Sequence, residues 1–216
     1  MNILQHLLSL FFPERCVSCN KKDETLCNTC IQGFSPADPF PKEWILPLYY
    51  YKDPKVRKAL WALKYGNRKL LGNIFGKLLY EHFLEEAAEE KLFADNKRWL
   101  VIPIPASLSR KKKRGYNQAL LLAKGICEAD TEKILMFTPL VLRKSIHTKS
   151  QTETKSRTER LGNVYGSFTV INPVTVYGAH ILLIDDIVTT GATLIEAKRV
   201  LKEAGAKTVT ALTVAH

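Results

Sequence analysis

The run ILLIDDIVTTGAT, residues 181–193, decides the fold predicted for this chain. Its first four residues are apolar and mostly branched, as expected of a parallel strand buried on both faces. Asp185 and Asp186 follow directly, and a turn from Thr189 to Thr193 leads into a segment with apolar residues at helical spacing. Ligands of open α/β folds bind at the carboxyl ends of parallel strands. The sequence therefore predicts a ligand site at the end of this strand.

The chemistry of the turn suits a sugar phosphate. Hydroxyls, free backbone N–H groups and the positive end of a helix dipole converge there, and together they favour a phosphate. The turn consists of Thr189, Thr190, Gly191, Ala192 and Thr193. A glycine in this turn leaves room for the backbone to approach the phosphate. Two adjacent carboxylates repel each other and a phosphate, unless vicinal hydroxyls or a divalent cation face them. The alternative is a buried strand that ends in an ordinary turn.

This run resembles the phosphoribosyl-pyrophosphate (PRPP) binding motif of type I phosphoribosyltransferases. The resemblance implies that Asp185 and Asp186, the candidate catalytic residues, hold the ribose hydroxyls, while residues 189–193 hold the 5-phosphate. It also implies PRPP or a ribose phosphate as ligand, with Mg²⁺ as its companion ion. The fold that it implies is α/β, with a mostly parallel sheet flanked by helices.

Four of the five cysteines form two pairs, Cys16-x-x-Cys19 and Cys27-x-x-Cys30. Zinc takes four thiolates in a tetrahedron, and each pair presents two sulfur atoms from one tight turn. Two disulfides are disfavoured because no secretion signal is recognisable, and a redox dithiol explains only one pair. We therefore expect a structural zinc ion that does no chemistry, since four thiolates leave no open position on the metal.

The chain divides into two predicted parts. Residues 1–40 are expected to form an N-terminal helix, the four-cysteine zinc module and a proline-rich linker, and residues 41–216 the phosphoribosyltransferase-like domain. The first residues predict an amphipathic helix that docks on the body, with a membrane-surface role as the alternative. No apolar run reaches the roughly 18–20 residues that span a bilayer, and the N-terminus is a poor signal peptide. A cytoplasmic protein is expected.

The remaining pattern predicts the elements around the motif. We expect an edge strand at 45–51, a helix that begins at Asp53-Pro54, a second helix at 67–92, and strands at 98–104, 140–142, 168–171 and 207–214.

Positive charge is concentrated in one stretch. The net charge is +11, and residues 101–170 hold 13 Lys and Arg against five Asp and Glu. Such a field favours polyanions, either nucleic acid or a pyrophosphate-bearing small molecule. In type I phosphoribosyltransferases the loop after the first core strand grips pyrophosphate, and the resemblance assigns this role to Ala106, Ser107 and Arg110. The alternative for the basic run 110–114 is a solvated face.

Residues 143–167 are polar, basic and rich in Ser and Thr. A polar loop of this length inside a compact domain is usually functional, so we expect a flexible loop that closes over the ligand. Its Gln151, Arg157 and Arg160, with Asn163, are expected to reach a bound anion, because Arg makes bidentate contacts with phosphates. The alternative is a disordered linker.

Motifs along the whole chain resemble one branch of these proteins, the ComF family of bacterial competence proteins. The matching features are the double CxxC, Leu63-Lys64-Tyr65 before a nearby Gly, Pro103-x-Pro105, RGYNQ at 114–118, the series Gln151…Arg157…Arg160…Asn163…Phe168, and DDIVTTGAT. The resemblance implies a role in uptake of transforming DNA.

Three functions stay open on this basis. The first is a working phosphoribosyltransferase whose acceptor the sequence does not reveal. The second is a DNA-handling protein that binds single-stranded DNA or other competence proteins and uses the ribose-phosphate site as a ligand sensor. Against it, the sequence lacks an aromatic-studded basic groove of the kind that stacks single strands. The third is a scaffold that binds no sugar phosphate, which the two adjacent acids argue against.

Overall fold

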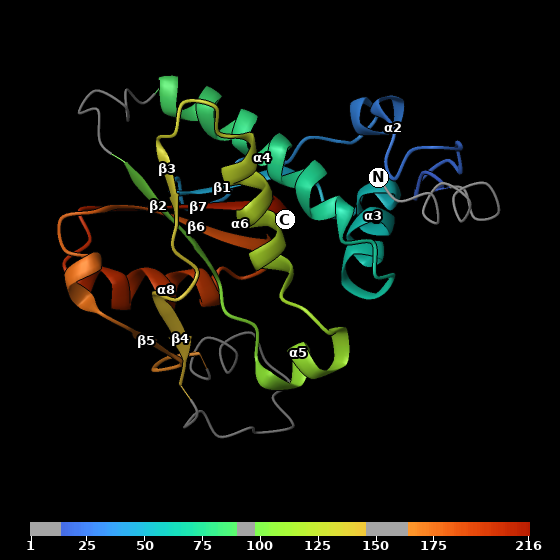
Figure 1. The fold of residues 1–216 in the computed structure, drawn as a ribbon. Coiled ribbons are helices and arrows are strands. Elements are labelled where there is room, and N and C mark those ends of the chain that lie inside the picture. Colours follow the sequence, from blue (N-terminus) through green and yellow to red (C-terminus); the bar gives the residue numbers. More distant parts are fainter. Residues whose placement is uncertain (1–13, 90–97, 146–163) are drawn as a thin grey trace, which may run out of the picture.

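The computed structural model of this chain describes residues 14–89, 98–145 and 164–216. Its centre is a five-stranded sheet in the order β1-β7-β6-β2-β3, and all neighbouring strands in it are parallel (Figure 1). The strands are β1 (Ile45–Tyr49), β2 (Trp99–Pro103), β3 (Leu135–Phe137), β6 (His180–Ile187) and β7 (Thr208–Ala215). The predicted α/β fold with a mostly parallel sheet is confirmed.

Helices cover both faces of this sheet. Helices α4 and α6 lie on one face and α8 on the other (Figure 1). The helices are α2 (Asn28–Gln32), α3 (Pro54–Tyr65), α4 (Leu70–Glu89), α5 (Leu108–Arg114), α6 (Gln118–Ala129) and α8 (Ala192–Glu203), with a 3-10 turn η1 at Pro173–Thr175. A separate antiparallel pair joins β4 (Leu142–Lys144) to β5 (Phe168–Val170).

The apolar run at the start of β6 explains its central place. Ile181 and Leu183 point into the core under α8, whereas Leu182 and Ile184 point into the core under α4 and α6. All four side chains are fully buried. A strand that is covered on both faces needs apolar residues at successive positions, so this run can lie only in the interior of the sheet.

Helices α4 and α6 approach each other at glycine residues. A Cβ atom added to Gly76 would lie 2.5 Å from the backbone carbon of Gly125, and one added to Gly125 would lie 2.6 Å from the backbone oxygen of Gly72. No side chain fits in such a gap, so these glycines allow the two backbones to pack directly. This contact fixes α6, whose first residues contribute to the candidate site.

Helix α3 begins where the sequence predicted. Asp53 caps it, because its Oδ1 accepts hydrogen bonds from the backbone N–H groups of Lys55 (2.7 Å) and Val56 (3.4 Å). The apolar face of α3 packs into the same core as Cys16 and Cys27. The cysteine-containing segment is therefore built onto the body of the molecule through α3.

Several predicted boundaries differ from the structure. The second helix begins at Leu70, not at 67, because Asn67 has a left-handed backbone with φ of 53°. The strand predicted at 140–142 is β4 at Leu142–Lys144, so Arg143 and Lys144 belong to a strand and not to the predicted loop. Strand β3 was missed, since Met136 and Phe137 lie at the exposed edge and lack an alternating pattern. The basic run 110–114 lies in helix α5, with Ser107 as its N-cap, and not in a loop.

Two predicted features fall outside the described residues. These are the N-terminal helix and most of the predicted flexible loop. None of the helices that the structure describes combines the length and the apolar character needed to cross a bilayer.

Candidate functional site

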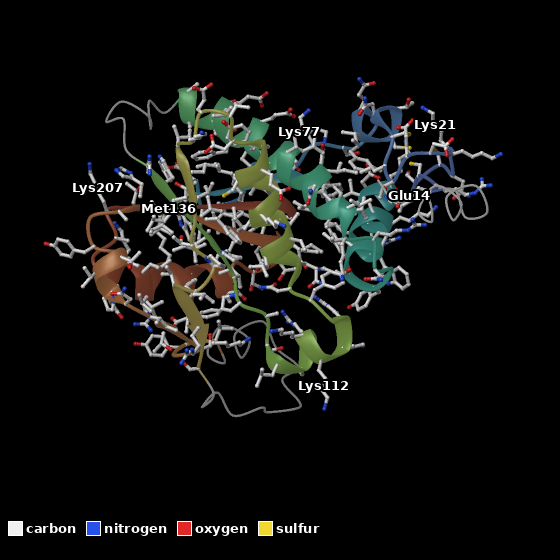
Figure 2. All side chains as sticks on the ribbon, viewed as in Figure 1. Glu14, Lys21, Lys77, Lys112, Met136 and Lys207 are labelled. Atoms are coloured by element: carbon white, nitrogen blue, oxygen red, sulfur yellow. The ribbon has the colours of Figure 1, made fainter. Side chains whose placement is uncertain are left out.

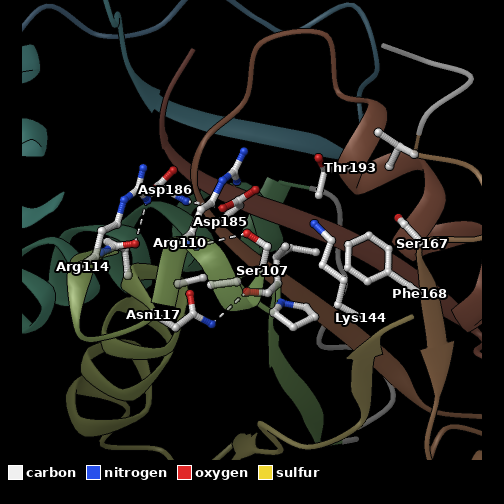
Figure 3. A pocket seen from close by; sticks show the side chains of 16 residues that line it. Ser107, Arg110, Arg114, Asn117, Lys144, Ser167, Phe168, Asp185, Asp186 and Thr193 are labelled. Carbon is white, nitrogen blue, oxygen red and sulfur yellow. Dashed lines mark hydrogen bonds between the residues drawn. The ribbon is translucent and has the colours of Figure 1, made fainter. Parts of the chain in front are cut away.

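A pocket of about 380 Å³ opens at the carboxyl end of β6. Its walls come from segments that are far apart in the sequence: the loop after β2, helix α5, the start of α6, strand β4, the start of β5, the end of β6 and the start of α8 (Figure 3). The polar side chains in the wall are Ser107, Arg110, Arg114, Asn117, Gln118, Lys144, Ser167, Asp185, Asp186 and Thr193. The pocket lies where parallel α/β sheets hold their ligands.

Most of the residues predicted from the sequence meet at this pocket. Ala106, Ser107, Arg110, Asp185, Asp186 and Thr193 all line it. A smaller adjoining pocket, of about 40 Å³, is lined by residues 187–194 and by Asp185. This second pocket contains the predicted phosphate-binding turn, Thr189, Thr190, Gly191 and Ala192. Gln151, Arg157, Arg160 and Asn163 lie outside the described residues.

The two acids have different environments. The Nζ atom of Lys64 lies 3.2 Å from Oδ1 of Asp186, and both side chains are largely buried. The backbone N–H of Asp186 donates a 2.8 Å hydrogen bond to Oδ1 of Asp185. Burial and the neighbouring Asp186 carboxylate raise the pKa of Asp185 to about 7, although that hydrogen bond and the cations Lys64 and Arg110 oppose the rise. Near neutral pH, Asp185 is therefore only partly ionised in the ligand-free protein.

The turn before α8 has the backbone geometry of a helix N-terminus. Gly191 is its N-cap residue, with a left-handed φ of 76°. An added Cβ atom there would meet the ring of Phe40 at 3.4 Å and Ile45 at 3.5 Å. The left-handed backbone is by itself a reason for glycine at this position, and room for a phosphate stays a prediction.

Cations surround the acids on several sides. Arg110 and Arg114 come from α5 and Lys144 from β4 (Figure 3). Burial lowers the pKa of Lys144, and repulsion from Arg110 lowers it further, while Asp185 opposes the shift. An anion in the pocket would restore the charged form of this lysine. The site can therefore accept a highly charged anion beside the two carboxylates.

Sequence analysis missed two of the basic residues at the acids. Lys64 appeared only within a family motif, and Lys144 only within a predicted loop. The one signal for Lys64 was its place in the last turn of a helix before a glycine, which says nothing about its distance from Asp186. Both residues reach the site through tertiary contacts between distant segments.

The four paired cysteines gather in one cluster. Their sulfur atoms all lie within 4.8 Å of one another. The Sγ–Sγ distance is 3.8 Å between Cys16 and Cys30 and 3.6 Å between Cys19 and Cys27. Zinc–sulfur bonds of about 2.3 Å in a tetrahedron place the sulfur atoms about 3.8 Å apart. All four cysteines have free thiols and form no disulfide, so the cluster can hold a zinc ion.

The thiol of Cys16 is already suited to lose its proton. Burial opposes its ionisation, but hydrogen bonds from the backbone of Cys19, Cys27 and Ser18 outweigh burial and lower its pKa to about 6. Backbone N–H groups that donate to sulfur are expected at a site built for thiolate ligands.

Comparisons with known proteins agree with this arrangement. A family model described as the phosphoribosyl transferase domain matches residues 138–216. The chain is 34% identical over 145 residues to competence protein ComFC of Streptococcus pneumoniae, and the aligned region covers 67% of this chain and 58% of that protein. It is 35% identical over 158 residues to ComFC of Bacillus subtilis, and this aligned region covers 73% of this chain and 58% of that protein. It thus spans less than two thirds of the length of these ComFC proteins.

A second group of relatives carries a different name. DNA utilization protein YhgH of Shigella flexneri is 26% identical over 208 residues, which covers 90% of this chain and 85% of that protein. Among solved structures, glutamine PRPP amidotransferase from B. subtilis is similar in fold, at 17% identity and a TM-score of 0.45. The alignment covers 72% of this chain and 30% of the amidotransferase chain.

The relatives, the family model and the cysteine cluster agree on one assignment. The chain is a ComF-family homologue of ComFC and YhgH, with a phosphoribosyl transferase domain matched at residues 138–216 and a four-cysteine cluster near its N-terminus.

Proposed function

We propose that this protein binds PRPP, or ribose 5-phosphate, in the two adjoining pockets at the end of β6. The 5-phosphate occupies the small pocket formed by residues 189–193, and the ribose hydroxyls donate to Asp185 and Asp186. The pyrophosphate of PRPP, with Mg²⁺, occupies the basic part of the larger pocket.

The observation that supports this most strongly is that the two pockets share a wall. Asp185 and Thr193 line both of them. A ligand that extends from the turn into the larger pocket therefore passes the two carboxylates. PRPP has a phosphate, a vicinal diol and a pyrophosphate in this same order along its length. The turn donates N–H groups to a phosphate, the acids accept from hydroxyls, and the cations attract pyrophosphate.

The reaction that fits these groups is transfer of the phosphoribosyl group to an acceptor. Asp185 and Asp186 would orient the ribose, while Arg110, Arg114 and Lys144 stabilise the negative charge that develops on departing pyrophosphate. Mg²⁺ supplies further positive charge to the pyrophosphate when it is bound. Catalysis of this kind depends on positioning and electrostatics, and it needs no nucleophilic side chain.

Isothermal titration of the protein with PRPP, ribose 5-phosphate and ribose, each with and without Mg²⁺, tests the proposal. We expect both phosphates to bind, ribose alone not to bind, and Mg²⁺ to tighten the binding of PRPP. Failure of both phosphates to bind contradicts the proposal. Pyrophosphate release from PRPP then separates an enzyme from a sensor, because a sensor binds PRPP without releasing pyrophosphate.

The ribose-phosphate site does not explain a surface of exposed aromatic residues on α3 that has cations of α5 beside them. This surface favours a second function, the binding of single-stranded nucleic acid. Trp61 is 62% exposed and Tyr65 is 45% exposed on α3, with ring centroids 5.5 Å apart. Lys113 and Arg114 of α5 lie over the ring of Tyr65, at 5.9 and 5.1 Å from its centroid. We call these four residues the aromatic–basic surface. Exposed rings with adjacent cations are the elements that hold single strands by stacking and by phosphate contacts.

The sequence had argued against such a surface, because no stretch interleaves aromatic and basic residues. The structure brings them together from α3 and α5, with Lys112 projecting from α5 away from the sheet (Figure 2). The names of the relatives, which refer to competence and to DNA utilization, also support a role in DNA uptake. We therefore propose that the protein acts in competence through both sites.

A further inference from the structure

Lys64 has no role in the function proposed above, although it is paired with one of the two acids. Its Nζ atom lies 3.2 Å from Oδ1 of Asp186, and the side chains are only 15% and 13% exposed. Ion pairs on the surface contribute little to folding stability, because water screens them. Breaking a largely buried pair costs more, since removing one partner leaves the other charge buried without compensation.

The position of Lys64 separates it from the ligand-binding residues. Asp186 lines the larger pocket, whereas Lys64 does not line it. Lys64 therefore contacts Oδ1 of Asp186 without forming part of the pocket wall. A carboxylate has two oxygen atoms and accepts several hydrogen bonds. With Oδ1 held by Lys64, the remaining capacity of Asp186 is available to a ligand hydroxyl.

The last turn of α3, which carries Lys64, is fixed by the segment after α5. The hydroxyl of Tyr116 donates to the backbone oxygen of Leu63. The guanidinium of Arg114 donates to the hydroxyl of Tyr65 at 3.1 Å. The residues on both sides of Lys64 are thus held by side chains of the RGYNQ motif, residues 114–118. This gives the motif a physical role, which is to place Lys64.

The opposite end of α3 is attached to the cysteine cluster. The Nζ atom of Lys58 donates to the backbone oxygen of Ser18, between Cys16 and Cys19, at 3.1 Å. Asp53 caps the helix and also accepts from the backbone N–H of Ser35 at 2.9 Å. Helix α3 therefore contacts the cysteine-containing segment through Lys58 and the acid pair through Lys64.

We propose that Lys64 is a positioning residue of the sugar-phosphate site, which holds the Asp186 carboxylate in the orientation that accepts a ribose hydroxyl. This inference rests on the proposed function of the site. Besides Lys64, the cations near the acid pair among the described residues are Arg110 and Arg114 of α5 and Lys144 of β4. All three line the pocket, whereas Lys64 is the cation paired with Asp186 at 3.2 Å.

Binding of PRPP and ribose 5-phosphate to five variants tests the inference. Lys64→Met should weaken both ligands at least tenfold, while Lys64→Arg should stay within about threefold of the parent, since Arg keeps the charge and donates to a carboxylate. Lys55→Met is the matched control, because Lys55 is exposed on the same helix. The double variant Lys64→Met with Asp186→Asn should bind about as weakly as Asp186→Asn alone, because coupled residues are not additive.

Each other outcome overturns the inference in a distinguishable way. Parent-like binding by Lys64→Met, or losses that multiply in the double variant, shows that Lys64 does not act through Asp186, and the proposed site survives. Loss of binding in Lys64→Arg as well as Lys64→Met, with lowered urea midpoints in both, assigns Lys64 a merely structural role. A parent protein that binds neither phosphate overturns the proposed function and this inference together.

Discussion

The backbone N–H of Asp186 donates a 2.8 Å hydrogen bond to the side chain of Asp185, the residue before it. This contact turns the Asp185 carboxyl back toward the chain, and the Asp186 carboxylate is held by Lys64. Two adjacent acids at the end of one strand therefore have different partners. The difference has a consequence for stability that can be measured without any ligand.

Stability should depend on pH through Asp185. Its pKa is raised from 3.8 to about 7, first by burial and then by Asp186. The folded protein keeps this proton between about pH 4 and pH 7, whereas the unfolded chain releases it, so this group costs stability as the pH rises through that range. Asp185→Asn removes the cost. Its gain in urea midpoint over the parent should grow from about pH 4.5 to pH 7 and level off above that.

The control for this measurement is Asp38→Asn, since Asp38 is an exposed acid that lines neither pocket at the end of β6. Its difference from the parent should be small and constant across the same pH range. A gain for Asp185→Asn that does not change with pH would show that the Asp185 carboxyl titrates normally in the folded protein.

Each chain should bind one zinc ion through Cys16, Cys19, Cys27 and Cys30. Metal analysis after dialysis should give about one equivalent in the parent and much less in Cys16→Ser. Because a closed metal site contributes folding energy, this variant should also loosen residues 14–35. Cys127→Ser is the matched control, as Cys127 lies on α6 outside the cluster. Less than half an equivalent of zinc in the parent contradicts the prediction.

The sequence predicted those parts of the site that are contiguous in the chain. The strand, the two acids and the turn follow one another between residues 181 and 193, so their spacing alone predicts a ligand site. The cysteine cluster was predictable for the same reason. Arg114 and Tyr65 are in contact although they lie 49 positions apart in the sequence. Lys64 and Asp186 are also in contact, and their separation along the sequence is larger still. No local pattern records such contacts, because they depend on how α3 and α5 pack.

Single-stranded DNA should bind to the aromatic–basic surface with a strong dependence on salt. Trp61→Ala removes one stacking ring and should weaken binding by roughly 5- to 150-fold, since stacking contributes about 1–3 kcal/mol per base. Tyr177→Ala is the control, because Tyr177 is also highly exposed but lies elsewhere. Replacing Lys111, Lys112 and Lys113 with Ser should flatten the slope of log affinity against log salt by about two units. An unchanged slope would place the DNA surface elsewhere.

The turn before α8 should lose its phosphate site when Gly191 is replaced by Val. The φ of 76° at Gly191 is a conformation that β-branched residues rarely adopt, so the turn must change shape. Ribose 5-phosphate binding should fall below detection by titration calorimetry. Gly178→Val is a matched control, because Gly178 has a similar φ of 69°, has no neighbour near an added Cβ atom, and lines neither pocket. If both variants bind as the parent does, the phosphate lies elsewhere.

Asp186→Asn should weaken PRPP binding roughly thirtyfold or more without unfolding the protein. Asn has nearly the same shape as Asp but carries no charge, so a ribose hydroxyl loses a charge-assisted hydrogen bond. Removing one charged partner of a buried contact typically costs about 2–5 kcal/mol, which corresponds to a factor of about 30 or more in affinity. The substitution also leaves Lys64 without its charged partner at 3.2 Å, so the urea midpoint should fall measurably while the protein stays folded. Titration calorimetry of Asp186→Asn beside Asp38→Asn measures the effect, and equal affinity in the two variants would exclude Asp186 from the ligand site.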